Sequence, residues 1–180
     1  NHDLRVCLER LSYIYEAGIF DYLKQIKNPI ILEIGAGYGT LAYQLLQNFP
    51  NAKYIIIDIP ESLIFSSIYL STLLPTADIH FLNNYEISHI NLLQNIDLVI
   101  NTISMSEFLE QQVSFYCEKI KLLFNDDTLF FEHNEDRRPA GFCDAASIIS
   151  NYFTLRETIS GKYIPYHPRS NCSARIWINK

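Results

Sequence analysis

The chain has 180 residues, of which 48% are hydrophobic and 19% charged, with 12 Tyr and 11 Phe. This length suits a single domain, and the apolar content can bury a sizeable core, so the composition excludes intrinsic disorder. The formal net charge is −6. Because proteins that neutralise phosphates along an extended surface are basic, we do not expect nucleic acid as a partner.

No apolar run approaches the roughly 20 residues that a membrane-spanning helix needs, and the first residues lack the pattern of a signal peptide. The 4 cysteines are widely spaced, without a C-x-x-C pair that would indicate zinc or a disulfide framework. We therefore expect a cytoplasmic protein with reduced, mostly buried thiols and no metal site. The absence of Met at position 1 leads us to expect a trimmed N-terminus.

Two helices are predicted before the first strand. An apolar stripe at helical spacing runs up to Gly18 and consists of Leu4, Cys7, Leu8, Leu11, Ile14 and Tyr15. A second, shorter helix is indicated by Phe20, Leu23 and Ile26. We treat residues 1–27 as an N-terminal helical segment and residues 28–180 as the core domain.

Strands and helices alternate through the core. The predicted strands are 30–34, 54–57, 79–82, 96–100, 128–132, 153–159 and 173–178, and the predicted helices include 105–124 and 145–149. Because no helix separates the last two strands, they should pair as an antiparallel hairpin. The expected fold is α/β, a doubly wound sheet of seven strands with helices on both faces. It comprises five parallel βα units and the terminal antiparallel hairpin.

Ligands of doubly wound sheets bind beyond the carboxyl ends of the strands, near the topological switch point. The glycine-rich loop 35–39 follows the first predicted strand there. Its glycines permit a tight turn and close approach of a ligand, unless they serve packing alone. Asp58 stands roughly 20 residues further on, where a carboxylate can accept two ribose hydroxyls. The loop and Asp58 together predict a ligand that contains a nucleoside.

The spacing of the glycines distinguishes two classes of nucleoside ligand. A dinucleotide fingerprint, G-x-G-x-x-G/A, would place Gly or Ala where this chain has Thr40. The third glycine instead comes one residue earlier, in the pattern Glu33-x-Gly35-x-Gly37-x-Gly39. This pattern resembles the first motif of class I S-adenosylmethionine-dependent methyltransferases, whose Rossmann-like sheet of seven strands is also similar. An NAD(P)-dependent oxidoreductase is the first alternative.

The resemblance covers almost the whole chain after Asn28. It is strongest in residues 32–42 (LEIGAGYGTLA) and 49–63 (FPNAKYIIIDIPESL). Together with Val99-Ile100-Asn101-Thr102, these stretches resemble a bacterial group of sugar O-methyltransferases. The Asn/Asp-Pro-Pro-aromatic tetrapeptide typical of nitrogen methylation is absent after the fourth strand. The resemblance implies methyl transfer to a hydroxyl oxygen of a saccharide or similar polar small molecule.

The resemblance also implies a cofactor-binding set, which consists of Glu33, Gly35, Ala36, Gly37, Gly39, Asp58, Ile59, Asn83 and Asn101. The glycines would let the loop pass beneath the methionine and ribose portions of S-adenosylmethionine. Glu33 would orient the methionine amino group, and Asp58 would hold the ribose, with Ile59 against the adenine. Asn83 or Asn84 would meet the adenine edge, where many relatives have an acidic residue. Asn101 would line the methionine end.

A sugar hydroxyl is a poor nucleophile, so its methylation needs a general base or a metal. One catalytic candidate is His133, which follows the fifth predicted strand, although an exposed loop histidine is the alternative. Glu107 is the other candidate, but Ser104-x-x-Glu107 before an apolar helix also reads as a capping box. Arg137 and Arg138 could grip a phosphate or carboxylate on the acceptor.

One loop near the C-terminus could contact the acceptor. The loop 163–169 mixes aromatic faces with polar tips, which suits a sugar but needs no ligand to explain it. The chain is also close to a bare core, with little sequence for a substrate cap. The second alternative is therefore a methyltransferase-fold subunit that binds a partner and catalyses nothing.

Overall fold

The computed structural model describes residues 2–87, 95–161 and 172–180. Its helices are α1 (His2–Glu16), α2 (Ile19–Lys24), α3 (Thr40–Asn48), α4 (Pro60–Leu73), α5 (Glu110–Lys121) and α6 (Ala145–Ile149). Its strands are β1 (Ile30–Ile34), β2 (Lys53–Asp58), β3 (Asp78–Asn83), β4 (Leu98–Thr102), β5 (Leu129–Glu135), β6 (Thr154–Ile159) and β7 (Cys172–Ile178). In these ranges no helix is both long and apolar enough to cross a membrane.

All seven strands form one sheet in the order β3-β2-β1-β4-β5-β7-β6. The first five strands run parallel, and β7 pairs antiparallel with both β5 and β6. The predicted seven-stranded sheet with a terminal antiparallel hairpin is confirmed. Because β7 lies between β5 and β6, the order differs from the 3-2-1-4-5-6 order of the dinucleotide-binding sheet.

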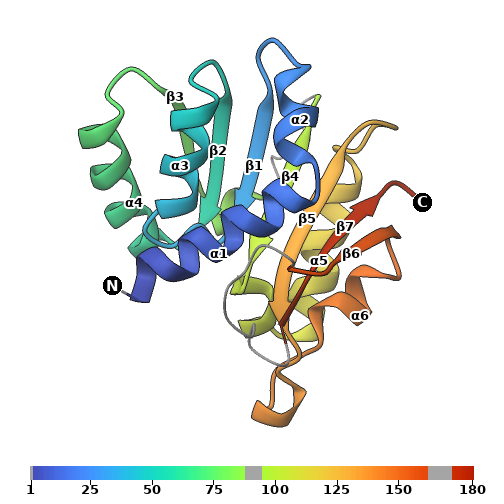
Figure 1. The fold of residues 1–180 in the computed structure, drawn as a ribbon. Coiled ribbons are helices and arrows are strands. Elements are labelled where there is room, and N and C mark those ends of the chain that lie inside the picture. Colours follow the sequence, from blue (N-terminus) through green and yellow to red (C-terminus); the bar gives the residue numbers. More distant parts are fainter. Residues whose placement is uncertain (1, 88–94, 162–171) are drawn as a thin grey trace.

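Helices cover both faces of this sheet, as expected (Figure 1). Successive strand residues point to opposite faces, so Ile31 packs into the cluster that includes residues of α1, α2 and α3, while Leu32 packs into the cluster that includes α5 and α6. Both faces of the central strands are therefore buried. This burial explains why β1, β2 and β4 read as continuous apolar runs rather than as alternating patterns.

The fifth strand is longer than predicted. It continues past position 132 to Glu135, because its last residues pair with β7: His133 lies opposite Ala174 and Glu135 opposite Cys172. His133 is therefore a strand residue and only 3% exposed, so the alternative of an exposed loop histidine is wrong. The antiparallel hairpin thus fixes the position of one catalytic candidate.

The single helix predicted over 105–124 is wrong. A 3₁₀ turn occupies Ser104–Glu107, and α5 begins only at Glu110 after an extended Leu109. The side chain of Gln112 caps α5 by accepting the Leu109 amide at 2.9 Å. The capping box that the sequence offered as an alternative at Ser104 and Glu107 does not form, since the Ser104 hydroxyl donates to the Ile34 carbonyl oxygen at 3.1 Å.

Helix α1 buries only part of the apolar stripe that the sequence predicted, and its buried face is rotated from that stripe towards Tyr13. Cys7, Tyr13 and Ile14 are buried, whereas Leu8 and Tyr15 are more than half exposed. The helix crosses the face of the sheet, as the blue ribbon in Figure 1 shows. It is therefore the N-terminal segment that closes one side of the region described next.

Candidate functional site

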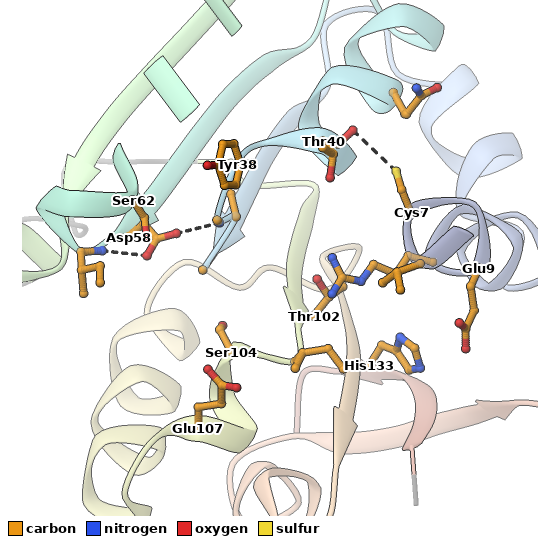
Figure 2. A pocket seen from close by; sticks show the side chains of 18 of the residues that line it. Cys7, Glu9, Tyr38, Thr40, Asp58, Ser62, Thr102, Ser104, Glu107 and His133 are labelled. Carbon is orange, nitrogen blue, oxygen red and sulfur yellow. Dashed lines mark hydrogen bonds between the residues drawn. The ribbon is translucent and has the colours of Figure 1, made fainter. Parts of the chain in front are cut away.

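A cavity of about 860 Å³ opens at the carboxyl ends of β1, β2, β4 and β5. This is the switch point of the sheet, because the chain order reverses between the neighbouring strands β1 and β4. In Figure 2, Asp58 and Ser62 lie on one side of the cavity, Cys7 and Glu9 on the other, and Glu107 and His133 below. Seven of the predicted site residues line it: Gly35, Ala36, Gly37, Asp58, Ile59, Glu107 and His133.

The three glycines of the loop have different reasons to be glycine. A Cβ on Gly35 would overlap the Ser104 side chain, and one on Gly39 would lie 2.9 Å from Leu70 Cδ1. Both are therefore required by packing. A Cβ on Gly37 would meet nothing within 4 Å, yet Gly37 lines the cavity with φ of 55°. Gly37 thus leaves open space where a ligand can approach the backbone.

Asp58 joins the loop to the start of α4. Its Oδ2 accepts the Gly37 amide at 2.8 Å, and its Oδ1 accepts the Ile59 amide at 2.8 Å. Burial raises the pKa of this carboxyl, while these two hydrogen bonds and one with Ser62 lower it. The bonds hold the carboxylate at the cavity wall, where its remaining lone pairs can accept hydroxyls.

Glu33 lies beneath the loop and is 1% exposed. The Tyr54 hydroxyl donates to its Oε2 at 2.8 Å. Burial raises the pKa of Glu33 to about 7, against the lowering effects of Tyr54 and of the nearby charge of Arg10. A neighbouring cation would favour the ionised carboxylate and so bind at this position.

Asn101 supports the cavity floor and does not line it. The side chain is fully buried, and its Nδ2 donates to the Ile34 carbonyl oxygen at 2.9 Å. Its Oδ1 accepts from Asn134 Nδ2 at 2.9 Å and from the Met105 amide at 3.3 Å. Asn101 therefore ties the end of β4 to β1 and β5.

The residue after β4 has a strained backbone. Ile103 lines the cavity with φ of 69° and ψ of −34°, which is an outlier for a β-branched residue. Its amide donates to the His133 carbonyl oxygen at 2.8 Å, and its carbonyl oxygen accepts the Ser106 amide at 3.1 Å. These bonds hold the chain in a conformation that directs the 3₁₀ turn across the cavity floor.

Asn83 and Asn84 do not line the cavity. Asn83 ends the edge strand β3, and its side-chain oxygen accepts the Tyr85 amide at 2.9 Å. Its own amide donates to Glu86 Oε2 at 3.1 Å. The structure thus shows Asn83 closing a local turn, and the predicted contact with adenine stays a prediction.

The two catalytic candidates reach the cavity from different elements. The His133 ring lies against that of Tyr13 from α1, with 4.7 Å between the ring centroids. Glu107 Oε1 accepts from Arg137 Nη1 at 2.8 Å, and about half of the Glu107 side chain is exposed. Arg138 pairs with Asp136 at 2.6 Å. The two arginines proposed to grip an acceptor thus each bind a carboxylate of this chain.

Residues of α1 that line the cavity were missed by the sequence analysis, Arg10 above all. Arg10 lies three residues from both Cys7 and Tyr13 and so shares the buried face of the helix. The sequence carried no clear signal for it, because the apolar stripe did not identify which face of α1 is buried. Cys7 adds a bond from its thiol to the Thr40 carbonyl oxygen, 3.7 Å long, which joins α1 to the start of α3.

Metal ligands are not gathered within the part of the chain that the structure describes, where no group of three His, Cys, Asp or Glu side chains could hold an ion. Glu132, an acidic residue near the end of β5, forms an ion pair with Arg175 at 2.7 Å. All four cysteines are buried. The aromatic loop 163–169 lies outside the described residues.

No protein-family model and no curated protein matches the chain. Among solved structures, the PH0226 protein of Pyrococcus horikoshii OT3 is similar, with a TM-score of 0.69, 12% identity, and coverage of 95% of this chain and 90% of that one. A protein named as a candidate O-methyltransferase from Nostoc punctiforme PCC 73102 gives 0.65 and 14%, covering 94% and 56%. LepI in complex with S-adenosylmethionine gives 0.62 and 12%, covering 86% and 44%.

These similarities concern the fold. The chain has the Rossmann-like fold of class I methyltransferases, with the strand order and terminal hairpin described above. It spans 56% of the Nostoc protein and 44% of LepI. Since one fold hosts many reactions, the activity has to be argued from the cavity itself.

Proposed function

We propose that the chain is an S-adenosylmethionine-dependent methyltransferase that acts on a hydroxyl oxygen of a saccharide or similar polar small molecule. The observation that carries this proposal is the cavity at the switch point, where open backbone at Gly37 meets the carboxylate of Asp58. Two of the structurally similar proteins also support it: one is named as a candidate O-methyltransferase, and the other, LepI, is in complex with S-adenosylmethionine.

The residues present fit this cofactor. Asp58 would accept the ribose hydroxyls, and Ile59, about half exposed beside it, would pack against adenine. Gly37 would approach the ligand most closely, and Glu33 would attract the methionine ammonium. The cavity of about 860 Å³ lies towards the upper end of the roughly 300–1,000 Å³ range of small-molecule sites. It has room for a cofactor and a small acceptor.

The chain's own residues would supply alignment and a proton acceptor. When bound, S-adenosylmethionine supplies a methyl group activated by positive sulfur. Transfer is an in-line displacement, in which the acceptor oxygen bonds to the methyl carbon as the carbon–sulfur bond breaks. His133 would take the hydroxyl proton, since it lines the cavity, its backbone is fixed by pairing with β7, and its ring packs against Tyr13. Glu107, held by Arg137, is the second candidate base.

Calorimetric titration with S-adenosylmethionine, S-adenosylhomocysteine and NADH tests the cofactor class. We expect binding of the first two in the micromolar range and none of the third. Binding of NADH alone would overturn the proposal in favour of an oxidoreductase. The strand order argues against an oxidoreductase, because the dinucleotide-binding sheet has no strand inserted between its fifth and sixth strands, whereas β7 lies there in this chain.

Transfer of labelled methyl to a panel of saccharides and polyols tests the reaction. We expect labelled product together with release of S-adenosylhomocysteine in equal amount. If the cofactor binds but no hydroxyl acceptor is labelled and no S-adenosylhomocysteine is released, the chain is a non-catalytic subunit with a methyltransferase fold. Labelling of nitrogen acceptors only would refute the assignment to oxygen.

A further inference from the structure

Arg10 is a half-buried charge without a matching partner in the described chain. It projects from α1 and lines the cavity. Its Nε is inaccessible to solvent and has no hydrogen-bond partner there, and no ion pair joins its guanidinium to a described carboxylate. Burial lowers the pKa of Arg10, which records the cost of removing the cation from water. A group of this kind is stabilised when an anion enters the cavity.

Glu33 does not fully compensate this charge. The two groups interact electrostatically, and the Glu33 carboxylate is already bound by the Tyr54 hydroxyl. The pKa of Glu33 is raised to about 7, so at neutral pH the carboxylate is only partly ionised. Arg10 therefore lines the cavity, and the buried, ionisable Glu33 lies within its electrostatic reach beneath the loop.

This arrangement matches one part of the proposed cofactor. A free α-amino acid end carries a carboxylate and an ammonium on the same carbon, and no other part of S-adenosylmethionine carries an anion. We propose that Arg10 binds the α-carboxylate of the methionine portion, so that Arg10 and Glu33 form a paired site for a zwitterion. The inference rests on the proposed function. Guanidinium suits the role because its planar fork can donate two parallel hydrogen bonds to a carboxylate.

A pair of ligands that differ in the amino-acid end tests this inference. S-adenosylhomocysteine carries the zwitterion, whereas 5′-methylthioadenosine shares its adenine, ribose and sulfur and lacks it. The dissociation constants of both are measured by calorimetry for the wild type, Arg10→Gln and Arg10→Lys. Arg156→Gln is the matched control, because Arg156 is a half-exposed arginine of β6 that does not line the cavity.

We expect Arg10→Gln to weaken S-adenosylhomocysteine roughly ten- to a hundredfold, the usual effect of losing a charge-assisted hydrogen bond, and to leave methylthioadenosine within about twofold. Arg10→Lys should recover part of the loss, and Arg156→Gln should change neither constant. Equal weakening of both ligands would overturn the inference and leave Arg10 as a support of α1. Unchanged affinity for S-adenosylhomocysteine would overturn it too.

A ligand variant covers the case in which Arg10→Gln does not fold. Decarboxylated S-adenosylmethionine keeps the amine and the sulfonium but lacks the carboxylate, and it is titrated into the wild-type protein. We expect it to bind roughly ten- to a hundredfold more weakly than S-adenosylmethionine; equal affinity refutes the role of Arg10. If no adenosyl ligand binds the wild type, the proposed function itself has failed, which is a different result from loss of selectivity.

Discussion

The carboxylate of Asp58 accepts the backbone amide of Gly37 across the gap between the ends of β2 and β1, at 2.8 Å. The other carboxylate oxygen accepts the Ile59 amide, so one side chain determines where both the loop and the start of α4 lie. Asp58 would therefore act on the cofactor twice, by direct contact and by shaping the loop beneath it.

Asp58→Asn should weaken S-adenosylhomocysteine almost as much as Asp58→Ala. An amide has one oxygen, so its NH₂ group would face a backbone amide that is itself a donor. We expect a loss of roughly ten- to a hundredfold in affinity for each variant, typical of charge-assisted hydrogen bonds, measured by calorimetry. Wild-type affinity in Asp58→Asn would show that shape alone, without charge, suffices at this position.

Alanine at Gly35 and at Gly37 should have different consequences. Gly35→Ala must displace the Ser104 side chain and adopt φ of 74°, so we expect several kcal/mol lost from the free energy of unfolding. Gly37→Ala meets no atoms and should lose only about 1 kcal/mol, from its positive φ. Its cofactor affinity should nonetheless fall, because the new methyl group enters the cavity. Urea denaturation measures the stability of the two variants, and equal losses of stability would contradict the packing argument.

Glu33 should make stability depend on pH. Its pKa is about 7 in the folded chain against 4.5 ordinarily, so the folded state binds more protons between these values. The contribution of Glu33 to the free energy of unfolding is therefore greatest below pH 4.5. It falls as the pH rises to about 7 and is constant at higher pH. The loss is on the order of 3 kcal/mol.

Urea denaturation of the wild type and Glu33→Gln from pH 4 to 8 isolates this effect, since the variant keeps every other titrating group. The difference between the two free energies of unfolding should therefore decrease as the pH rises from 4.5 to about 7. Tyr54→Phe removes the hydrogen bond that lowers the pKa of Glu33 and should move the window to higher pH. A pH-independent difference would show that Glu33 titrates normally.

His133→Asn should lower kcat roughly a hundredfold or more, the usual loss for a general base, and leave cofactor affinity unchanged. Asparagine retains a polar planar group in the space beside Tyr13, which limits repacking. Steady-state kinetics and calorimetry give the two values. If instead Glu107→Gln abolishes turnover and His133→Asn does not, Glu107 is the base.

The ion pair between Glu132 and Arg175 should be needed for folding rather than chemistry. Glu132 is fully buried, and Arg175 and Asn134 bind its two carboxylate oxygens. Arg175→Met leaves the acid uncompensated, so we expect a loss of about 3–5 kcal/mol in thermal or urea unfolding. Adding Glu132→Gln should recover part of it. Loss of cofactor binding in a fully stable Arg175→Met would refute this role.

Local patterns predicted the strands but not all of their ends. The apolar runs of β1 and β2 reflect burial on both faces, which a single segment reveals. The length of β5 depends on pairing with β7, and the break before α5 depends on Asn134, whose side chain accepts the Ser106 amide at 3.2 Å. Such contacts join residues distant in sequence, and periodicity within one segment does not contain them.

The residues of the candidate site likewise differ in whether a local sequence pattern marks them or only contacts between distant residues do. Gly37 and Asp58 were found because their spacing along the chain is itself the signal. Arg10 was not, because its importance depends on where α1 crosses the sheet. The apolar stripe even included Leu8 and Tyr15, which the structure leaves exposed, since helical spacing alone does not decide between neighbouring faces.

The position of α1 has a consequence for the order of folding. During synthesis this helix leaves the ribosome before the surfaces it packs on, at Thr40 and at His133, have been made. The His133 surface is complete only when β5 has been paired with the late strand β7. Contacts so distant in sequence form slowly. The cavity should therefore be among the last parts of the molecule to assemble, and a nascent chain should not bind ligand until the C-terminal hairpin has been added.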